Sequence, residues 1–537
     1  MDRRSFLLSS GAGAAVLLGT AAGYWRWREI TPTVHYPGRM EGHFLRDRKA
    51  LPAPSYEVVT DVAIFGSGIA GLTAAWKLAK EGHTRFLVID GPQPYGNAAG
   101  GRHGELAYPT GSHYLPLPSV ESFHVRELLH DLGVILRNPT MQRPYYDERC
   151  ILHAPQERVL IGGRWQDGIL PKEGVPKWEL EEHERFARTM AQLKTGRGRD
   201  GKRLFALPLA MSSTDPQWRA LDRLSVKQWM EQNSYRSPTL HWYLDYCCRD
   251  DYGATYDHVS AWAGLHYFCS RGGEAENAGT GEWLTWPDGL APLAIGLDKA
   301  AGNRRKPGTV VSLKETRAGI EALCFEFAQG QARSFTVKAK RAVCAMPLFI
   351  VARVMPAMNA YGFDAQHHMP AYAPWMVTNF LMKRFPRELR EAPLSWDNVV
   401  YQGRGLGYVV STHQDIRVSP PPKSVFTAYA ALAGETPEAA RKWLDTASPE
   451  ELLDLASADL RAAYGHGFAP CVERADITLR AHAMASPRPG FLGNEGLRLL
   501  READGPILFA HADLSGLSVF EEAAWWGYQA ALKILRA

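Results

Sequence analysis

Residues 58–90 read VVTDVAIFGSGIAGLTAAWKLAKEGHTRFLVID, and this stretch decides the fold. It begins with a β-branched apolar run, typical of a buried parallel strand, and a glycine-rich turn follows at once. Residues 72–82 then have the apolar spacing of a helix, and residues 86–89 form a second apolar run that ends at Asp90. The pattern predicts a strand, a tight turn, a helix and a second strand, as in a Rossmann-type α/β domain.

The glycine-rich turn predicts a dinucleotide site, at residues Gly66, Ser67, Gly68, Ile69, Ala70 and Gly71. Gly66 allows the tight turn, Gly68 lets the backbone approach a pyrophosphate, and Gly71 lets the helix pack close to the sheet. The N-terminus of the helix attracts phosphate charge, and Asp90 is placed to accept hydrogen bonds from a ribose hydroxyl. This fingerprint alone does not separate FAD from NAD.

Three separated segments carry a family resemblance. They are residues 58–114, which include GGR at 100–102 and GSHY at 111–114; residues 309–347, which read as strands; and residues 507–531, a short strand followed by His-Ala-Asp and a helix. In this order they resemble the flavin-containing amine oxidase and phytoene desaturase superfamily. The resemblance implies FAD, and a nicotinamide-dependent Rossmann enzyme is the alternative.

The resemblance also implies which residues contact FAD. In the superfamily a Gly-Gly-Arg turn lies against the pyrophosphate, a later glycine segment runs beneath the isoalloxazine ring, and a helix N-terminus points at the flavin pyrimidine. The residues assigned on this basis are Gly101, Arg102, Gly111, Ser112, His113, Tyr114, Val311 (or its neighbour Val310) at the adenine, Asp513 near the ribityl chain, and Phe520 and Glu521. Because no flavin-attachment cysteine lies near Asp513, we expect noncovalent FAD.

The resemblance further implies a discontinuous domain organisation. The FAD-binding domain is expected from residues 56–118, 286–356 and 480–537, and a mixed α+β substrate domain from residues 119–285 and 357–479. The motif WPDG at 286–289 marks the return to the FAD-binding domain and is expected to open a helix.

An amine is the leading prediction for the substrate. Residues 241–252 (HWYLDYCCRDDY) are aromatic and acidic, and further aromatic and acidic residues follow up to Glu282. Aromatic faces with carboxylates suit a cationic amine, such as a polyamine. The alternative interpretation is that these aromatics pack the second domain while the carboxylates face solvent.

His113 is the candidate catalytic residue, because relatives of the polyamine-oxidase type carry Gly-Ala-His-Trp in the segment beneath the flavin; the alternative is a structural hydrogen bond to backbone. Many amine oxidases hold a lysine near flavin N5, and Thr378 or Asn379 is expected at that place here. The predicted reaction is hydride transfer from the α-carbon of an amine to flavin N5. A desaturase or saturase of an apolar polyene and a non-catalytic flavin-binding or assembly protein are alternatives.

The N-terminus predicts export. Residues 2–8 read DRRSFLL and precede an apolar stretch, which resembles the twin-arginine signal. We expect residues 1–28 to be this signal, residues 29–55 to be a linker, and the protein to be periplasmic or on the outer face of the cytoplasmic membrane, with the twin-arginine machinery as a partner. The alternative is a simple membrane anchor over residues 6–24, which are enough to span a bilayer core.

Composition excludes several other classes. The 537 residues carry a formal net charge of +4, with no basic stripe or recognisable nucleic-acid fold, so nucleic acid is not an expected partner. The seven cysteines form no CxxC and no Cys/His set with zinc-like spacing, so no metal site and no disulfide framework are predicted.

Overall fold

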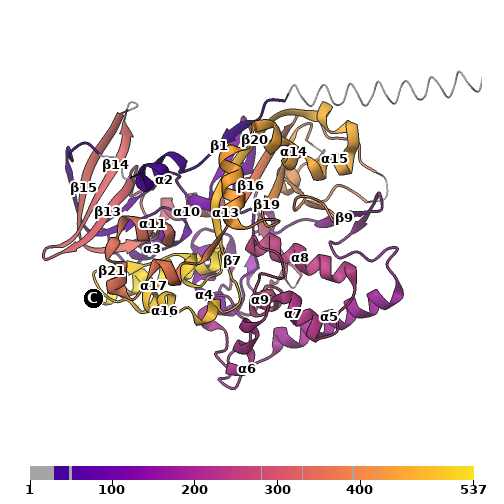
Figure 1. Cartoon of the computed structure of the whole chain (residues 1–537), viewed down its shortest axis with the longest axis horizontal. Coiled ribbons are helices and arrows are strands. Elements are labelled where there is room, and N and C mark those ends of the chain that lie inside the picture. Colours follow the sequence, from indigo (N-terminus) through magenta and orange to yellow (C-terminus); the bar gives the residue numbers. More distant parts are fainter. Residues whose placement is uncertain (1–29, 48–50, 280, 329–330, 390–391, 420) are drawn as a thin grey trace, which may run out of the picture.

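The computed structural model describes residues 30–47, 51–279, 281–328, 331–389, 392–419 and 421–537. Figure 1 shows two neighbouring lobes, one around β13–β15 and α17 and the other around β16, β19 and β20. Each lobe is built on one large sheet. Smaller two-stranded sheets, among them β4–β5 and β6–β11, complete the fold.

The first lobe contains a seven-stranded sheet in the order β12-β3-β2-β15-β14-β13, with β21 beside β15. Strands β12, β3, β2, β15 and β21 run parallel, and β13–β15 form an antiparallel meander. The bounds are β2 Glu57–Phe65, β3 Phe86–Ile89, β12 Arg305–Lys306, β13 Thr309–Thr316, β14 Gly319–Ala328, β15 Gln331–Cys344 and β21 Ile507–Phe509. Three segments far apart in the sequence therefore build one sheet.

Alternation along β2 sends side chains to both faces of this sheet, because successive residues of a strand point in opposite directions. Val62 and Ile64 pack toward helices α3 (Ile69–Lys80) and α17 (Phe520–Arg536). Ala63 and Phe65 pack on the other side, in a cluster that includes residues of α11 (Leu348–Val354) and α16 (Glu495–Glu502). The last four residues of the strand, 62–65, are therefore buried on both faces, as the β-branched run predicts.

Helices α3 and α17 touch closely, and a glycine makes this contact. A Cβ added at Gly527 would lie 2.1 Å from the carbonyl oxygen of Ala70. Helix α10 (Ala291–Ala300), which follows the WPDG turn as expected, also packs on α3, and α4 (Phe123–Asp131) packs on α17. The helix that follows the glycine-rich turn, α3, is therefore packed against both α10 and the C-terminal helix α17.

The second lobe contains an eight-stranded sheet in the order β1-β20-β16-β19-β18-β17-β9-β10. The bounds are β1 Thr33–His35, β9 Glu157–Ile161, β10 Arg164–Asp167, β16 Ala371–Met382, β17 Asp397–Val400, β18 Tyr408–Val410, β19 Ser424–Ala431 and β20 Val472–Ser486. Helices of this lobe are α5 Lys177–Thr195, α7 Val226–Gln232, α8 Pro238–Tyr252, α9 Ala261–Ser270, α13 Pro437–Thr446, α14 Pro449–Ala456 and α15 Ala458–Tyr464.

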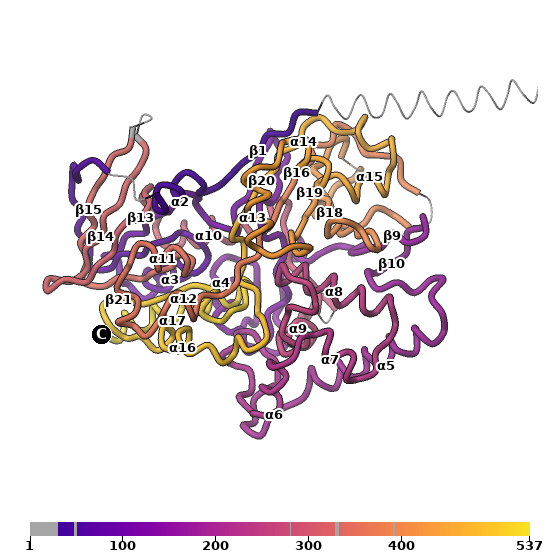
Figure 2. Tube along the Cα trace, viewed as in Figure 1, coloured from indigo at the N-terminus to yellow at the C-terminus, as the bar shows by residue number. Residues whose placement is uncertain are grey.

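Residues 29–55 were predicted to be a linker, and for residues 33–46 this prediction is wrong. Strand β1 pairs in parallel with β20, and helix α2 (Arg39–Arg46) follows it. Figure 2 shows this segment running from the second lobe to the first, where the ring of Phe44 lies 5.2 Å from that of Phe325. The prolines of this stretch flank the two elements, and a short edge strand needs pairing on one side only.

One predicted domain boundary changes, and the predicted signal is not covered by the structure. The predicted boundary at residue 480 falls inside β20, since this long strand belongs to the second sheet. Residues 1–28, the predicted signal, lie outside the described residues. Within the described part of the chain, no helix combines the length and apolar character needed to cross a bilayer.

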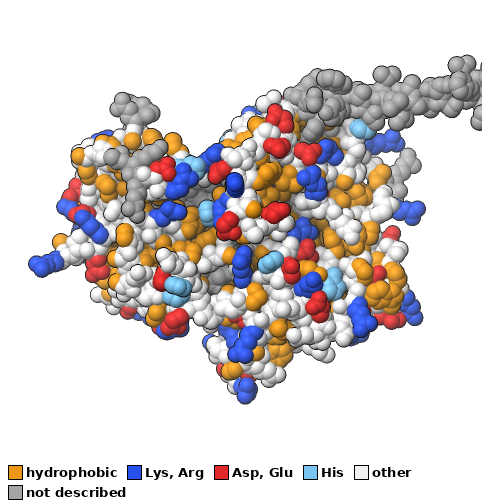
Figure 3. All heavy atoms as spheres, viewed as in Figure 1, with side chains coloured by type: hydrophobic (Ala, Val, Ile, Leu, Met, Phe, Trp, Pro, Cys, Tyr) orange, Lys and Arg blue, Asp and Glu red, His pale blue; other side chains and the backbone are white. Residues whose placement is uncertain are grey.

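The surface does not present one dominant charge on the face drawn in Figure 3. Acidic and basic side chains are interspersed there, and the outline is indented between the two lobes. The cavity described below lies between these lobes and is lined by residues of both.

Candidate functional site

A cavity of about 1120 Å³ lies between the two lobes. At one end it is lined by the glycine-rich turn, and at the other by Asp250, Asp251 and Arg271. We call the first the nucleotide end and the second the far end. Residues of α2 and the loop before it also line the cavity, so the predicted linker is part of its wall.

Each glycine of the turn has a separate structural reason. Gly66 has a φ of +112°, and a Cβ there would lie 2.6 Å from the carbonyl oxygen of Ala345. A Cβ at Gly71 would lie 1.9 Å from the carbonyl oxygen of Gly66. At Gly68, by contrast, a Cβ would meet no atom within 4 Å. Gly68 lines the cavity and precedes the first residue of α3, so its missing side chain leaves open space beside the helix N-terminus.

The other predicted residues of this turn have different positions. Ser67 and Ala70 are buried and line the cavity, and the Ser67 hydroxyl donates to the carbonyl oxygen of Asp90 at 3.1 Å. Ile69 also lines the cavity, whereas Gly71 serves the packing of α3 and is not part of the wall. The strand–turn–helix unit therefore has the predicted geometry.

Asp90 lies at the end of β3 and lines the cavity. One of its oxygens, Oδ1, accepts a hydrogen bond from Nη1 of Arg305 at 2.8 Å. Arg305 also pairs with Asp298 at 2.7 Å and donates to the Tyr95 hydroxyl at 2.9 Å. This arginine holds the Asp90 carboxylate in place, and nothing in the local sequence pattern had singled it out.

Gly101 and Arg102, which the family resemblance places at the pyrophosphate, do not line this cavity. These residues lie in a hairpin between β4 (Gly100–His103) and β5 (Leu106–Pro109), and neither lines the cavity. The turn that lies against the glycine-rich turn is 95–98, because a Cβ at Gly96 would be 3.6 Å from Cα of Gly68. In the hairpin, Gly101 makes room for the ring of Tyr108, because a Cβ at Gly101 would lie 2.3 Å from that ring.

Of the two residues predicted to lie at the adenine, one lines the cavity. Thr309 and Val310 line the cavity, whereas Val311 does not. The pairing of β13 with β14 has an irregularity between Val310 and Ser312, where Val311 has no partner. A bulge of this kind changes which side chain faces a given side, and a sequence pattern does not reveal it.

Residues 111–114 all line the cavity, as predicted. The amide of Ser112 donates to the carbonyl oxygen of Asn97 at 2.8 Å, and the hydroxyl of Tyr429 donates to the carbonyl oxygen of Gly111 at 3.0 Å. The ring of His113 stacks on that of Tyr429, with centroids 4.4 Å apart. Burial lowers the pKa of His113 to about 3, so this ring is neutral at physiological pH.

The C-terminal residues form a third part of the wall. Asp513 is buried and accepts hydrogen bonds from the Tyr372 hydroxyl at 2.5 Å and from the amide of Leu348 at 3.0 Å. Burial would raise the pKa of Asp513, but His511, 3.1 Å away, and these donors hold it below its ordinary value. Helix α17 begins at Phe520 with no side-chain cap on its N-terminus, which faces the cavity through Phe520 and Glu521. Burial raises the pKa of Glu521 to about 7.

The far end brings acidic and aromatic side chains together. Asp250 and Asp251 come from α8, and Arg271 follows α9 and pairs with Asp251. Asp250 lines the cavity and has no hydrogen-bond or ion-pair partner among the described residues. Burial, with Asp251 nearby, raises the pKa of Asp250 to about 7.

The aromatic wall differs from the one that the sequence suggested. It consists of His113, Tyr114, Trp375 and Tyr429, while Trp283 and Trp396 contact it from behind. Trp262 is packed in a core cluster of the helices, and the Glu282 carboxylate accepts from Gln156, so for these residues the packing interpretation holds. The sequence did not predict that Trp375, Trp396 and Tyr429 lie near one another, because only the pairing of strands in the second sheet brings them together.

Neither Thr378 nor Asn379 faces the cavity. Asn379 donates to the carbonyl oxygen of Pro109 at 3.0 Å, while Trp375 and Val377 on the same strand line the wall. No lysine lines the cavity within the part of the chain that the structure describes. All seven cysteines are free and buried, and burial raises the pKa of Cys247 and Cys248, so this pair is part of the packing.

Comparisons with known proteins support the fold. The family described as NAD(P)-binding Rossmann-like domain matches residues 64–132. No curated protein matches the chain. Among solved structures, putrescine oxidase bound to putrescine is 17% identical, with a TM-score of 0.61, and the match covers 90% of this chain and 100% of that one.

Two further structures have the same fold. Cyclohexylamine oxidase from Brevibacterium oxydans IH-35A is 17% identical, with a TM-score of 0.62 and coverage of 89% of this chain and 99% of that one. A fatty acid isomerase from P. acnes is 14% identical, with a TM-score of 0.56 and coverage of 88% and 98%. The predicted fold class, a Rossmann-type α/β domain with a mixed second domain, is confirmed.

Proposed function

We propose that the chain is an FAD-dependent oxidoreductase that oxidises an amine. The open space at Gly68 and the uncapped N-terminus of α17 support a ligand with phosphates near one helix and a charge-accepting ring near the other. The residues that would hold FAD are those of the glycine-rich turn, Asp90, residues 111–114, Asp513 and the start of α17. When bound, FAD would supply the acceptor for a hydride.

The residues present fit such a group. Gly68, His113 and Phe520 line one continuous cavity, so the cavity extends beyond the glycine-rich turn. Asp513 and Glu521 are buried acids beside it, so hydroxyl groups of a ribityl chain would find acceptors there. No cysteine lines this cavity among the described residues, in keeping with the proposal that FAD is held without a covalent bond.

The observation that carries the amine proposal is the position of Asp250. Asp250 lines the cavity without a hydrogen-bond or ion-pair partner among the residues that the structure describes, and the aromatic wall of His113, Tyr114, Trp375 and Tyr429 lines the same cavity. A carboxylate with aromatic faces attracts a cation, and the neutral wall then favours loss of the proton before oxidation. Putrescine oxidase and cyclohexylamine oxidase share the fold, and their substrates are amines by name.

Anaerobic mixing tests this proposal. Purified protein is combined without oxygen with putrescine, cyclohexylamine and other amines, and the flavin absorbance is followed. Bleaching by an amine supports the proposal, and bleaching by an unsaturated fatty acid or a carotenoid alone would move it to the desaturase alternative. Protein that binds flavin but responds to none of these would indicate the non-catalytic alternative, and colourless protein from flavin-rich cells would contradict the cofactor itself.

The FAD released by heat or acid tests the noncovalent part of the proposal separately. We expect intact FAD in the supernatant after denaturation. Flavin that stays on the precipitated chain would overturn this part alone.

We also propose export by the twin-arginine route to the periplasm or the outer face of the membrane, on the basis of DRRSFLL at residues 2–8. The double change Arg3→Lys and Arg4→Lys should leave the protein in the cytoplasm, because the receptor reads guanidinium geometry that lysine does not reproduce. Unchanged export of the double variant, or export in cells that lack this machinery, would favour the simple anchor instead.

A further inference from the structure

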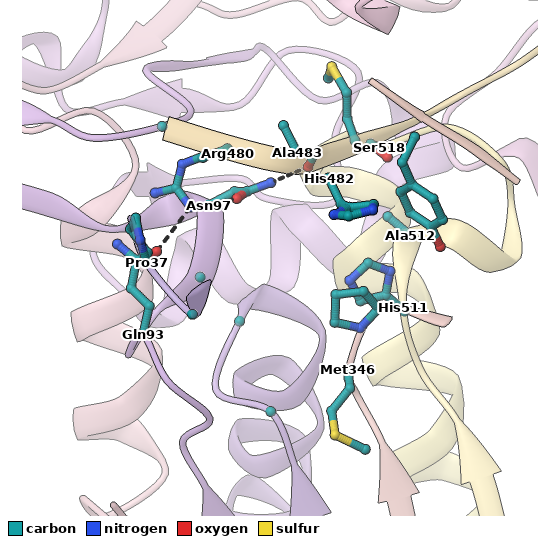
Figure 4. A pocket seen from close by; sticks show the side chains of 18 of the residues that line it. Pro37, Gln93, Asn97, Met346, Arg480, His482, Ala483, His511, Ala512 and Ser518 are labelled. Carbon is teal, nitrogen blue, oxygen red and sulfur yellow. Dashed lines mark hydrogen bonds between the residues drawn. The ribbon is translucent and has the colours of Figure 1, made fainter. Parts of the chain in front are cut away.

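Arg480 lies on β20 opposite Trp375 of β16, and it lines the cavity. Its Nε and Nη2 atoms donate to the carbonyl oxygen of Thr110 at 3.1 and 2.9 Å. Its Nη1 atom donates to Oε1 of Gln93 at 2.9 Å and to Oδ1 of Asn97 at 3.0 Å. Figure 4 shows this arrangement, with Arg480, Gln93 and Asn97 on one side of the pocket. All of these acceptors are neutral.

The charge of Arg480 is therefore not balanced by the described part of the protein. Three other arginines that line the cavity are paired with carboxylates: Arg271 with Asp251, Arg441 with Glu438, and Arg39 with Asp445. Arg353 also lines the cavity without an ion pair among the described residues, but its side chain is exposed to solvent. No such pair involves Arg480 among the described residues. Burial lowers its pKa to about 10, so it is still protonated at neutral pH. Arg480 is half-buried, and its unpaired charge faces a cavity large enough for a ligand.

The position of Arg480 relates it to the phosphate part of a dinucleotide. Asn97, which it contacts, belongs to the turn 95–98. This turn lies against the glycine-rich turn at Gly68, and the amide of Tyr95 donates to the Ser67 hydroxyl at 3.4 Å. The turn 95–98 thus contacts both the glycine-rich turn before α3 and the guanidinium of Arg480, and both the N-terminus of α3 and this guanidinium favour negative charge.

The expected source of positive charge at this end is absent from it. Arg102, assigned to the pyrophosphate, is exposed in the β4–β5 hairpin and does not line the cavity. The turn 95–98, which lies there instead, contains no basic residue. A pyrophosphate carries two negative charges, and guanidinium groups bind such oxygens with paired donors.

We propose that Arg480 binds the phosphate groups of the dinucleotide, in the role that the sequence had suggested for Arg102. The proposal rests on the proposed function only in taking the cofactor to be FAD. It makes the second sheet a participant in cofactor binding: β20 supplies the cation, and the Rossmann-type lobe supplies the backbone donors.

The test is titration of flavin-free protein with three compounds. FAD has both the ring and the pyrophosphate, riboflavin has the ring without phosphate, and ADP, used as a competitor, has the pyrophosphate without the ring. The variants are Arg480→Gln, which removes the charge, and Arg480→Lys, which keeps it. Arg474→Gln is the matched control, because Arg474 lies on the same strand outside the cavity and is paired with Asp476 at 2.7 Å.

We expect Arg480→Gln to weaken FAD and ADP alike by on the order of 10- to 100-fold. Riboflavin affinity should stay within about twofold, Arg480→Lys should recover part of the loss, and Arg474→Gln should match the wild type. Thermal unfolding of each flavin-free variant checks that the fold is kept. Raising the salt concentration should reduce FAD affinity more in the wild type than in Arg480→Gln.

Three results would overturn the proposal. Equal losses of FAD and riboflavin affinity would mean that Arg480 only holds the loops at Gln93 and Thr110 in place. Unchanged FAD affinity would mean that its charge serves another ligand. Wild-type protein that binds neither flavin would refute the proposed function itself, and with it this role, whereas the first two results leave the function intact.

Discussion

At the nucleotide end of the cavity the wall is mostly backbone, whereas at the far end it is mostly side chains. The glycine-rich turn, the turn 95–98, Gly111 and Ser112 present amides, carbonyls and open space. At the far end Asp250, Trp375 and Tyr429 come from α8, β16 and β19. Backbone sites need glycine at fixed spacing and so mark a continuous stretch of sequence. Side-chain sites assembled from separate elements leave no such mark.

Substitutions at Gly71 and Gly68 of the glycine-rich turn should have different effects, the first on folding and the second on cofactor binding. Gly71→Val should destabilise the protein by more than about 3 kcal/mol or prevent folding, because its Cβ would lie 1.9 Å from a backbone oxygen that cannot move away. Chemical denaturation of the flavin-free protein measures this loss. A soluble variant with wild-type stability would show that the turn rearranges easily. The nucleotide end would then not depend on glycine at fixed positions, which is the contrast drawn with the far end.

Gly68→Val should leave the fold and remove the cofactor. A Cβ at this position meets no atom within 4 Å, and the backbone is extended, so stability should change by about 1 kcal/mol or less. Flavin affinity should fall by more than about 100-fold, since the side chain fills the space beside the helix N-terminus. The flavin content of the purified variant measures this, and full occupancy would contradict the assignment of the phosphates to this turn.

At the far end, Asp250→Asn should act on substrate and not on FAD. We expect the KM for a cationic amine to rise about tenfold with unchanged flavin content. The pKa of Asp250 is raised to about 7, so its carboxyl is neutral below that pH and charged above it. In the wild type kcat/KM should therefore rise between about pH 6 and pH 8, and this rise should disappear in Asp250→Asn.

A second rise at higher pH should remain in both proteins, because hydride loss needs the neutral amine, and an alkylamine has a pKa of roughly 10.4. Glu276→Gln, a change of an exposed acid outside the cavity, is the control and should behave as wild type. Identical pH profiles for Asp250→Asn and wild type would remove this carboxylate from substrate binding.

His113→Ala should give the smallest effect of the series. The ring is neutral above about pH 3 and stacks on Tyr429, so its loss should slow flavin reduction a few-fold without shifting the pH profile. Stopped-flow reduction measures both, and Tyr429→Phe, which keeps the stacked ring, is the matched variant. A displaced pH profile would make His113 a proton carrier, and an unaffected rate would leave it only a packing role.

The sequence predicted best what lies together in the chain. The β2–α3–β3 unit, Asp90, residues 111–114 and the start of α17 all reach the cavity as expected. Local strand pairing accounts for the predicted residues that do not line the cavity: Gly101 and Arg102 lie in the β4–β5 hairpin, and at the bulge Val310 lines the cavity whereas Val311 does not. Arg480 and Trp375 face each other across two paired strands more than a hundred positions apart, which a pattern along the chain does not register.

Helix α17 has a consequence for the order of events during synthesis. The glycine-rich turn depends on it, because Gly527 packs on Ala70 and the Tyr528 hydroxyl bonds Glu127 across 401 positions of sequence. On the ribosome, β2 and α3 are synthesised long before α17, so the apolar face of α3 that α17 covers stays exposed in the meantime. Contacts of such separation also slow folding. A nascent chain of this protein therefore exposes an apolar, aggregation-prone helix surface during most of its translation. This surface needs protection, for example by a chaperone, until residues 507–536 have been synthesised.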